Sequence, residues 1–205
     1  MADLTGRTER AAAPGLAAAC SRPGVGVWCR KVRELLSSER FAHVMRVTEL
    51  AEAIARANDF TASEVETTVL AAVLHDSARE LPPGELFRLA PPRLQLEVEH
   101  PLTVHGRAGR KMAEQWGVKD EAVLSAIEGH VFGVSLDNRP GVAVYVADVT
   151  EPGRGVNHDI RELAFTDLNS AYCRAVHATV DYLNSVGKPV HPETMRVHGE
   201  ICSAD

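Results

Sequence analysis

The feature that most constrains this chain is an apolar run that ends in a histidine and an aspartate. Residues 69–74 read Val-Leu-Ala-Ala-Val-Leu, and His75 and Asp76 follow directly. An imidazole and a carboxylate at the end of a buried helix are costly unless a partner satisfies them. Both are ligands that Fe, Mn, Zn or Mg accept in proteins. The pair by itself is common, so the metal hypothesis depends on the rest of the chain.

The pattern from Trp28 onward is helical almost throughout. One expected helix carries apolar residues at i, i+3 and i+4 spacing from Val44 to Ile54, and His43 shares that buried face. Ser63, with Glu66 three residues later, predicts the start of the helix that ends at His75. Residues 142–149 read VAVYVADV, which suits a strand on composition, but the helical context favours a buried helix. The predicted fold class is therefore all-α.

Length and composition indicate a single globular domain. The 205 residues are 45% hydrophobic and 24% charged, which is ordinary for a globular protein. We expect a disordered Ala/Gly/Pro-rich leader over residues 1–25, the domain over 26–197 and a polar tail over 198–205. A net charge of -6 without a Lys/Arg-rich stripe argues against a nucleic-acid partner.

The sequence does not predict a membrane-spanning helix or a disulfide framework. No run of about 18 apolar residues is present, so no membrane partner is expected. The four cysteines, Cys20, Cys29, Cys173 and Cys202, show no C-x-x-C spacing. We therefore expect reduced thiols, no disulfide framework and a cytoplasmic location.

Several further histidines and aspartates fall at or near the ends of apolar helical faces. Any one histidine is most simply explained as a hydrogen-bonded core residue, and Asp148 alone as a carboxylate paired with an arginine. Burying all of them in one core without a common partner would be very expensive, which favours a shared metal. The candidate ligands are His43, His75, Asp76, His105, His130 and Asp148.

The order His, His-Asp, His, His, Asp resembles the HD-domain metal phosphohydrolase superfamily. Longer segments are similar to the bacterial YqeK-like family of symmetrical bis(5'-nucleosyl)-tetraphosphatases, which split diadenosine tetraphosphate into two ADP. The resemblance implies an all-α helical bundle with the metal site in its core. The segments that carry it are Arg40–Ala55, Val73–Pro82, Val104–Ala113, Val144–Arg154, Ile160–Ala171 and Val186–Met195.

The resemblance also implies roles for individual residues. The principal metal would be held by His43, His75, Asp76 and Asp148, while His105 and His130 would complete a second metal position or bind phosphate. One or two divalent ions per chain are expected, iron first, with manganese, zinc, cobalt or magnesium as alternatives. The metal would supply hydroxide by lowering the pKa of a bound water. The catalytic set is then Asp76, Arg79, His105 and His130.

The substrate implied by the resemblance is a nucleotide. Its phosphates would meet Arg79, which stands where the family usually has lysine, and Arg154. A surface salt bridge is an equal alternative for Arg154. His191 is a weaker substrate-binding candidate, for which a helix-capping role is an equal alternative. The sequence leaves a homodimer open.

The chain departs from the family pattern near His130. The family tends to read Arg-Tyr-His-Thr there, followed by a Gly-Arg-Pro-Gly loop, whereas this chain has Glu128, Gly129, His130 and Val131. Ser77 replaces the tyrosine that usually follows the His-Asp pair, and the stretch after Arg154 is about two residues shorter than in the family. Fewer cations suit a shorter phosphate chain, so a nucleoside 5'-monophosphate phosphatase is the first alternative. A nucleotide-binding regulatory module with little turnover is the second, and the intact ligand set argues against it.

Overall fold

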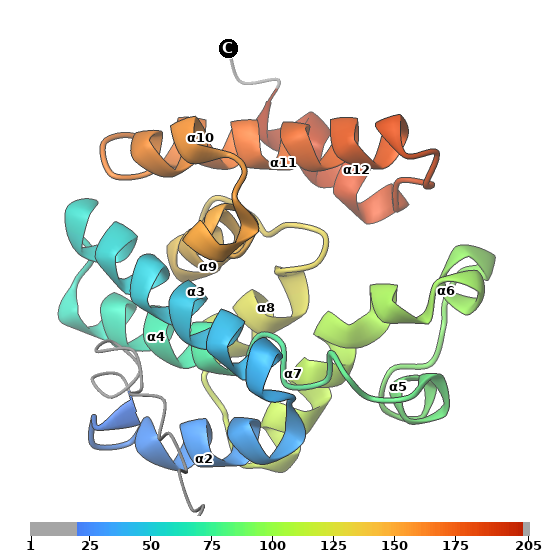
Figure 1. Cartoon of the computed structure of the whole chain (residues 1–205), viewed down its shortest axis with the longest axis horizontal. Coiled ribbons are helices and arrows are strands. Elements are labelled where there is room, and N and C mark those ends of the chain that lie inside the picture. Colours follow the sequence, from blue (N-terminus) through green and yellow to red (C-terminus); the bar gives the residue numbers. More distant parts are fainter. Residues whose placement is uncertain (1–19, 203–205) are drawn as a thin grey trace, which may run out of the picture.

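The computed structural model describes residues 20–202, and within them every regular element is a helix (Figure 1). The fold class predicted from the sequence is confirmed. The helices are α2 (Gly26–Leu35), α3 (Ser38–Ala57), α4 (Ala62–Leu74), α5 (Pro83–Leu89), α6 (Gln95–Glu99), α7 (His105–Gln115), α8 (Glu121–Gly129), α9 (Arg139–Thr150), α10 (His158–Leu163), α11 (Leu168–Ser185) and α12 (Pro192–Ile201), with 3-10 turns η1 (Pro101–Val104) and η2 (Pro152–Arg154).

Helix α9 lies at the centre of the bundle. It packs against α3, α4, α8 and α11, and residues 140–147 are all buried. This explains why residues 142–149 are apolar on every side and could be mistaken for a strand. Figure 1 shows α10, α11 and α12 across one end of the bundle, α2 at the opposite end, and α5 and α6 at one side.

Helices α7 and α8 approach each other closely because α7 carries glycine at the contact. A Cβ on Gly106 would collide with the backbone oxygen of Glu128 and with the side chain of Val131. A larger residue would therefore push the two helices apart. His105 and His130 lie directly beside this contact, so the glycine helps to place both side chains.

Some helix boundaries differ from the sequence-based expectation. The capping box of α4 is formed by Thr61 and Glu64, not by Ser63 and Glu66. The same three-residue spacing occurs two residues earlier, where the chain turns into the helix. The expected polar tail is also too long, because α12 continues to Ile201, whose side chain packs against the core. Residues 1–19 of the expected leader lie outside the described residues, whereas Cys20 and Val25 pack against the core.

The expectation of reduced thiols and no disulfide framework is wrong in this structure. Cys20 is bonded to Cys29, and Cys173 to Cys202, with Cα atoms 5.7 and 5.5 Å apart. These distances are ordinary for disulfides. Local spacing could not reveal the second pair, because it forms only where α11 packs on α12. Among residues 20–202, no helix is both long and apolar enough to cross a bilayer.

Candidate metal centre

The predicted metal ligands converge from the ends of separate helices. His75 terminates α4, His130 terminates α8, and His105 lies where η1 gives way to α7. His43 reaches the same region from α3, and Asp148 from α9. The four histidines are all buried.

Asp76 lies between the histidines and joins them into one cluster. Its Oδ1 is 3.2 Å from His105 Nε2 and 3.6 Å from His130 Nε2, while its Oδ2 is 3.5 Å from His75 Nε2 and 3.8 Å from His43 Nε2. Two sets of potential ligand atoms result, and both include Asp76. The first is His43, His75 and Asp76; the second is Asp76, His105 and His130.

Asp148 extends the first set. Its Oδ1 is 3.0 Å from His43 Nε2 and 2.6 Å from Arg154 Nη2. The carboxylate therefore contacts a predicted metal ligand and also forms the arginine pair considered as the alternative. Its pKa lies well below the ordinary aspartate range, because the bond to His43 and the nearby Arg154 outweigh the opposing effect of burial.

Three of the histidines are oriented by the main chain of their own helix end. The Nδ1 atom of each faces a carbonyl oxygen three residues earlier. His75 Nδ1 is 2.7 Å from the Ala72 oxygen, and His130 Nδ1 is 2.7 Å from the Ile127 oxygen. His105 makes the same contact with Leu102. A proton held at Nδ1 by a carbonyl leaves Nε2 unprotonated and free to bind a cation.

His43 is oriented by a side chain instead. Its Nδ1 is 3.0 Å from Oε1 of Glu151, a side chain that is almost fully buried. The other oxygen, Oε2, accepts hydrogen bonds from Arg46 Nε at 2.7 Å and from Gly153 N at 2.6 Å. Burial opposes the charged form, but the bonds from Arg46 and His43 lower the pKa of Glu151 to about 2. A carboxylate behind a histidine in this way fixes its ring and raises its basicity as a ligand.

Sequence reasoning missed Glu151, Arg46 and Arg40. Arg40 Nη1 is 3.2 Å from Asp76 Oδ2, so a cation contacts the central carboxylate directly. The signals were weak but present: Arg46 follows His43 by three residues on one helix face, and Glu151 opens the Glu-Pro-Gly-Arg segment. Neither pattern distinguishes a buried partner from a surface charge without the packing of α3 on η2.

The protonation states of the cluster suit cation binding. Burial lowers the pKa of His75 to about 4 and also lowers the pKa of His105. Burial opposes the ionisation of Asp76, yet the neighbouring His75 and His105 hold its pKa well below the usual range. His130 is the exception, because its bond to Asp76 outweighs burial and raises its pKa.

A divalent cation fits these residues. His75 Nε2 is buried without a hydrogen-bond partner among the described residues, and His43 Nε2 faces the carboxylates of Asp148 and Asp76 at 3.0 and 3.8 Å. His105 Nε2 and His130 Nε2 face each other at 2.9 Å, and Asp76 Oδ1 lies 3.2 and 3.6 Å from them. Imidazole nitrogens with carboxylate oxygens are a donor set that Fe, Mn and Zn all accept. A cation between them would satisfy nitrogens that the protein leaves unpaired.

The comparisons with known proteins agree with this geometry. Residues 40–153 match the HD domain family. The chain belongs to the HD domain family. It is 30% identical to the symmetrical bis(5'-nucleosyl)-tetraphosphatase of Bacillus subtilis, over 84% of this chain and 94% of that protein. It is 32% identical to the protein of the same name from Staphylococcus aureus, over 66% of this chain and 72% of that protein. The family resemblance predicted from the sequence is confirmed.

A solved structure shares the fold of this HD domain. It is the crystal structure of a predicted HD superfamily hydrolase involved in NAD metabolism from Clostridium acetobutylicum, with a TM-score of 0.79 and 24% identity. The match covers 88% of this chain and 97% of that chain. At this identity the likeness supports the helical architecture alone.

Two cavities of the HD domain are each lined by one of the predicted metal ligands. The Arg40 cavity, of about 350 Å³, is lined by His43, by three arginines and by three glutamates, namely Arg40, Arg46, Arg154, Glu39, Glu80 and Glu151. The Leu102 cavity, of about 500 Å³, is lined by His105, apolar residues and two cations, namely Leu102, Phe132, Leu183, Pro189, Arg79 and Lys188. Neither Arg79 nor Lys188 forms an ion pair with another residue in the range 20–202. The predicted phosphate-binding residues Arg79 and Arg154 therefore line different cavities.

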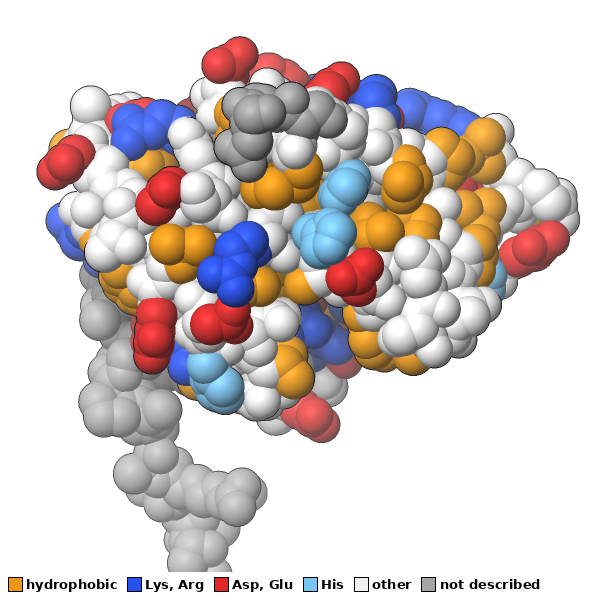
Figure 2. Space-filling model, turned by 90° about the horizontal axis from the view of Figure 1, so that it is seen from above, with side chains coloured by type: hydrophobic (Ala, Val, Ile, Leu, Met, Phe, Trp, Pro, Cys, Tyr) orange, Lys and Arg blue, Asp and Glu red, His pale blue; other side chains and the backbone are white. Residues whose placement is uncertain are grey.

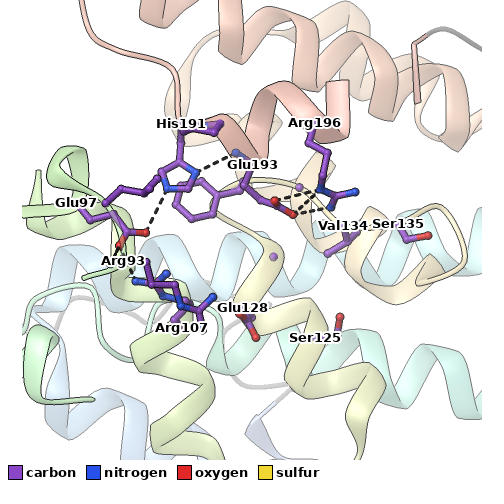
Figure 3. A pocket seen from close by; sticks show the side chains of 15 residues that line it. Arg93, Glu97, Arg107, Ser125, Glu128, Val134, Ser135, His191, Glu193 and Arg196 are labelled. Carbon is purple, nitrogen blue, oxygen red and sulfur yellow. Dashed lines mark hydrogen bonds and ion pairs between the residues drawn. The ribbon is translucent and has the colours of Figure 1, made fainter. Parts of the chain in front are cut away.

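His191 lies in the wall between the Leu102 cavity and a third cavity of about 600 Å³ (Figure 3). Its Nδ1 accepts a hydrogen bond from the Glu193 backbone at 3.1 Å, so the capping role is observed. Its Nε2 lies 3.2 Å from the buried Glu97, and its ring stacks on Phe132 with centroids 3.9 Å apart. Both ring nitrogens are engaged, so His191 offers a fixed ring face more than a free donor.

Proposed function

We propose that this chain is a metal-dependent phosphohydrolase that cleaves dinucleoside tetraphosphates symmetrically into two nucleoside diphosphates. The observation that carries the proposal is the access to the metal ligands from two cavities, each supplied with cations. A substrate with a nucleoside at each end of a long phosphate chain needs room on both sides of the reacting phosphorus. The activity for which the Bacillus subtilis and Staphylococcus aureus relatives are named supports the same substrate class.

The metal would be held by His43, His75, Asp76 and Asp148, with His105 and His130 completing a second position. When bound, a divalent cation lowers the pKa of a coordinated water and offsets phosphate charge. Its identity, with iron expected first, and the choice between one and two ions belong to the proposal. The donor set alone does not separate the candidate metals.

The side chains of this chain supply position and charge. Asp76 stays ionised because of its low pKa, so it can accept a hydrogen bond from the attacking water and orient it. Arg79 and Lys188 in the Leu102 cavity would bind the phosphates of one half of the substrate, and Arg154 those of the other. The water oxygen bonds to one of the two central phosphorus atoms as that atom loses its bond to the oxygen that bridges it to the other. The second nucleoside diphosphate leaves with the bridging oxygen, and the water gives up a proton to it or to solvent.

The apolar wall of the Leu102 cavity suits a nucleobase. Leu102 is exposed, and the buried ring of Phe132 is stacked on His191, so the cavity wall that includes His105 is partly apolar. A nucleobase stacks favourably on such a surface. Apolar contact at one end and cations beside the metal ligands are the arrangement expected for a nucleoside followed by phosphates.

A nucleoside 5'-monophosphate phosphatase is the second candidate. The loss of cations near His130, where Glu128 stands in place of an arginine, favours it. In the structure the carboxylate of Glu128 lies 3.3 Å from Arg110, and Glu128 lines the cavity beyond Phe132 instead of the two cavities at the metal ligands. The acid therefore does not remove positive charge from the region where the phosphates would bind.

Product analysis tests the proposal. Purified protein, loaded in turn with iron, manganese, cobalt, zinc and magnesium, is incubated with diadenosine tetraphosphate, ATP or AMP, and products are separated by anion-exchange chromatography. We expect ADP as the sole product from the dinucleotide. Phosphate release from AMP with an untouched dinucleotide would instead establish the second candidate. Nucleotide binding without turnover by any metal form would indicate a regulatory module.

A charge-matched control separates the metal centre from general effects of losing an acid. Asp76→Ala should abolish turnover, whereas Asp159→Ala, which removes an exposed partner of Arg174, should leave it unchanged. Two further expectations remain proposals: a homodimer, testable by light scattering, and a cytoplasmic location, testable by cell fractionation. The cytoplasmic proposal now depends on the nucleotide substrate, because the cysteines do not support it.

A further inference from the structure

Helices α11 and α12 carry a second group of potential metal ligands, away from the HD centre. His177 Nδ1 lies 3.0 Å from His198 Nε2, and the two rings are stacked with centroids 5.3 Å apart. Cys173 lies one helical turn before His177 and Cys202 one turn after His198, and these two cysteines form a disulfide. Figure 2 looks onto this end of the molecule and shows histidine side chains gathered near the centre of the face.

The spacing of these four residues is that of a two-helix metal site. Cys173 precedes His177 by four residues on α11, and His198 precedes Cys202 by four residues at the end of α12. Residues four apart lie on the same face of a helix. The two helices therefore present a cysteine pair and a histidine pair as successive cross-links between them. Two thiolates and two imidazoles are a common ligand set for tetrahedral zinc.

The histidine pair is already close to the geometry that zinc requires. Two nitrogens bound to a tetrahedral zinc at 2.0–2.1 Å lie about 3.3 Å apart, against 3.0 Å between His177 Nδ1 and His198 Nε2. Asp181 Oδ2 lies 3.4 Å from His177 Nε2. A carboxylate at that nitrogen keeps the proton there and leaves Nδ1 free as the ligand.

We propose that Cys173, His177, His198 and Cys202 bind one zinc ion when the Cys173–Cys202 disulfide is reduced. A dithiol reductant donates two electrons and two protons, so the protein disulfide becomes two thiols and the reductant becomes a cyclic disulfide. Zinc then displaces the two thiol protons and binds both thiolates and both imidazoles. Oxidation by a disulfide of low-molecular-weight thiols reverses the exchange and releases the ion.

The other disulfide, Cys20–Cys29, has no such histidine pair beside it and is removed in the experiment below. Cys20 contacts Met45 Sδ at 3.5 Å, and its partner Cys29 is buried. Both pairs would be reduced by the same reagent, but only the α11–α12 pair has two imidazoles one turn away. The site is independent of the proposed hydrolase function, since it shares no residue with the metal centre.

Either link would hold α12 in place. The start of this helix is capped by His191, whose ring forms part of the wall of the Leu102 cavity. The disulfide fastens the opposite end of α12 to α11 when the thiols are oxidised, and zinc would fasten the same end when they are reduced. The helix would therefore stay docked under both conditions.

Cobalt provides a probe that reports on this site alone. The experiment uses the full chain carrying Cys20→Ser and Cys29→Ser, reduced by a dithiol, freed of reductant under nitrogen and checked for both remaining thiols. Cobalt bound by thiolates shows a near-ultraviolet charge-transfer band that cobalt at the sulfur-free metal centre does not give. We expect the band to saturate at one equivalent beyond that taken up by the metal centre, and to disappear on addition of zinc.

Single variants assign the ligands. His177→Ala and Cys202→Ser should remove the band, and Asp181→Asn should weaken cobalt affinity about 10–100-fold, as outer carboxylates do. His177 is exposed, so its replacement should leave the fold intact, which circular dichroism would confirm. No band in the fully reduced protein overturns the proposal. A band that survives replacement of both His177 and His198 by alanine also overturns it.

Discussion

The four histidines at the metal centre are held in two different ways. His75, His105 and His130, which we call the helix-end region, are oriented by backbone carbonyls of their own helix ends. His43 is oriented by Glu151, which in turn is held by Arg46. The first arrangement depends on where helices stop, and the second on a chain of side chains from α3 to η2.

The difference shows which parts of the centre single substitutions can change. A backbone carbonyl cannot be mutated away, so the helix-end histidines lose their orientation only if the helices shift. The orientation of His43 can be removed by changing one buried carboxylate. We therefore expect metal affinity to be tunable through Glu151 and comparatively insensitive to side chains around the other three histidines.

The largest loss of activity should come from replacing Asp76, whose carboxylate faces both His43 and the three histidines of the helix-end region. Asp76→Asn keeps the shape of the side chain but removes the charge that faces all four histidines. We expect activity to fall by more than about 100-fold, beyond the 10–100-fold typical of outer-shell changes. Metal content measured by mass spectrometry should fall with it. Retention of both metal and activity in this variant would break the assignment of Asp76 as the central ligand.

Acidification should lower the stability of the metal-free protein, because His75 in the helix-end region is buried away from water. The pKa of His75 is about 4 in the folded chain and about 6.5 in an unfolded one. The unfolded state therefore binds an extra proton between these values, and the metal-free protein loses stability as pH falls from 6.5 towards 4. The full loss from this residue amounts to about 3 kcal/mol.

Thermal unfolding of metal-free protein between pH 7 and pH 4.5 measures this effect. His75→Gln should flatten the decline in melting temperature, whereas His158→Gln, at an exposed position on α10, should keep it. The raised pKa of His130 acts in the opposite sense and reduces the net slope. An identical slope in wild type and His75→Gln would contradict the assignment.

Glu151→Gln tests whether the side chain of Glu151 orients His43 for metal binding. The amide keeps the size of the carboxylate but loses the charge that holds Arg46 and His43. We expect metal affinity to fall about 10–100-fold with the fold retained, as measured by competition with a fluorescent chelator. Glu34→Gln, on the surface of α2, is the control and should have no effect. Unchanged affinity would mean that His43 needs no support from Glu151.

The smallest effect should come from Ser77, next to the central aspartate. Its Oγ is buried without a hydrogen-bond partner among the described residues. Ser77→Ala should therefore leave the free energy of unfolding unchanged or raise it by up to about 1 kcal/mol. The contrasting variant Thr48→Val removes a hydroxyl that donates to Val44 O at 2.8 Å and should cost about 1 kcal/mol. Both are measured by urea unfolding, and a clear loss in Ser77→Ala would indicate that its hydroxyl has a partner.

The sequence predicts the fold and the grouping of the candidate ligands better than it predicts the residues that hold those side chains in place. Helical periodicity and the apolar run of α9 were sufficient for an all-α core, and His43, the His75–Asp76 pair, His105, His130 and Asp148 do meet in one place. Metal ligands are detectable because several polar residues on apolar faces need a common partner.

The residues that were missed belong to contacts between distant parts of the chain. Glu151 supports His43 across 108 positions, and Glu97 holds His191 across 94. The Cys173–Cys202 pair likewise depends on the packing of α11 on α12. No local spacing marks such partners, because an isolated glutamate or cysteine looks the same whether it faces solvent or the core.

His75 and His130 each directly follow the last residue of a helix, and this placement limits how the chain length can vary. Each residue added to an α-helix rotates the later residues about the helix axis by about 100°, so one insertion within α4 or α8 would swing the ligand away from Asp76. A whole extra turn would restore the direction but move the ligand by about 5 Å along the axis. Insertions and deletions should therefore be confined to segments such as Ser135–Asn138 or Gly155–Asn157, which connect helices without setting where a ligand falls.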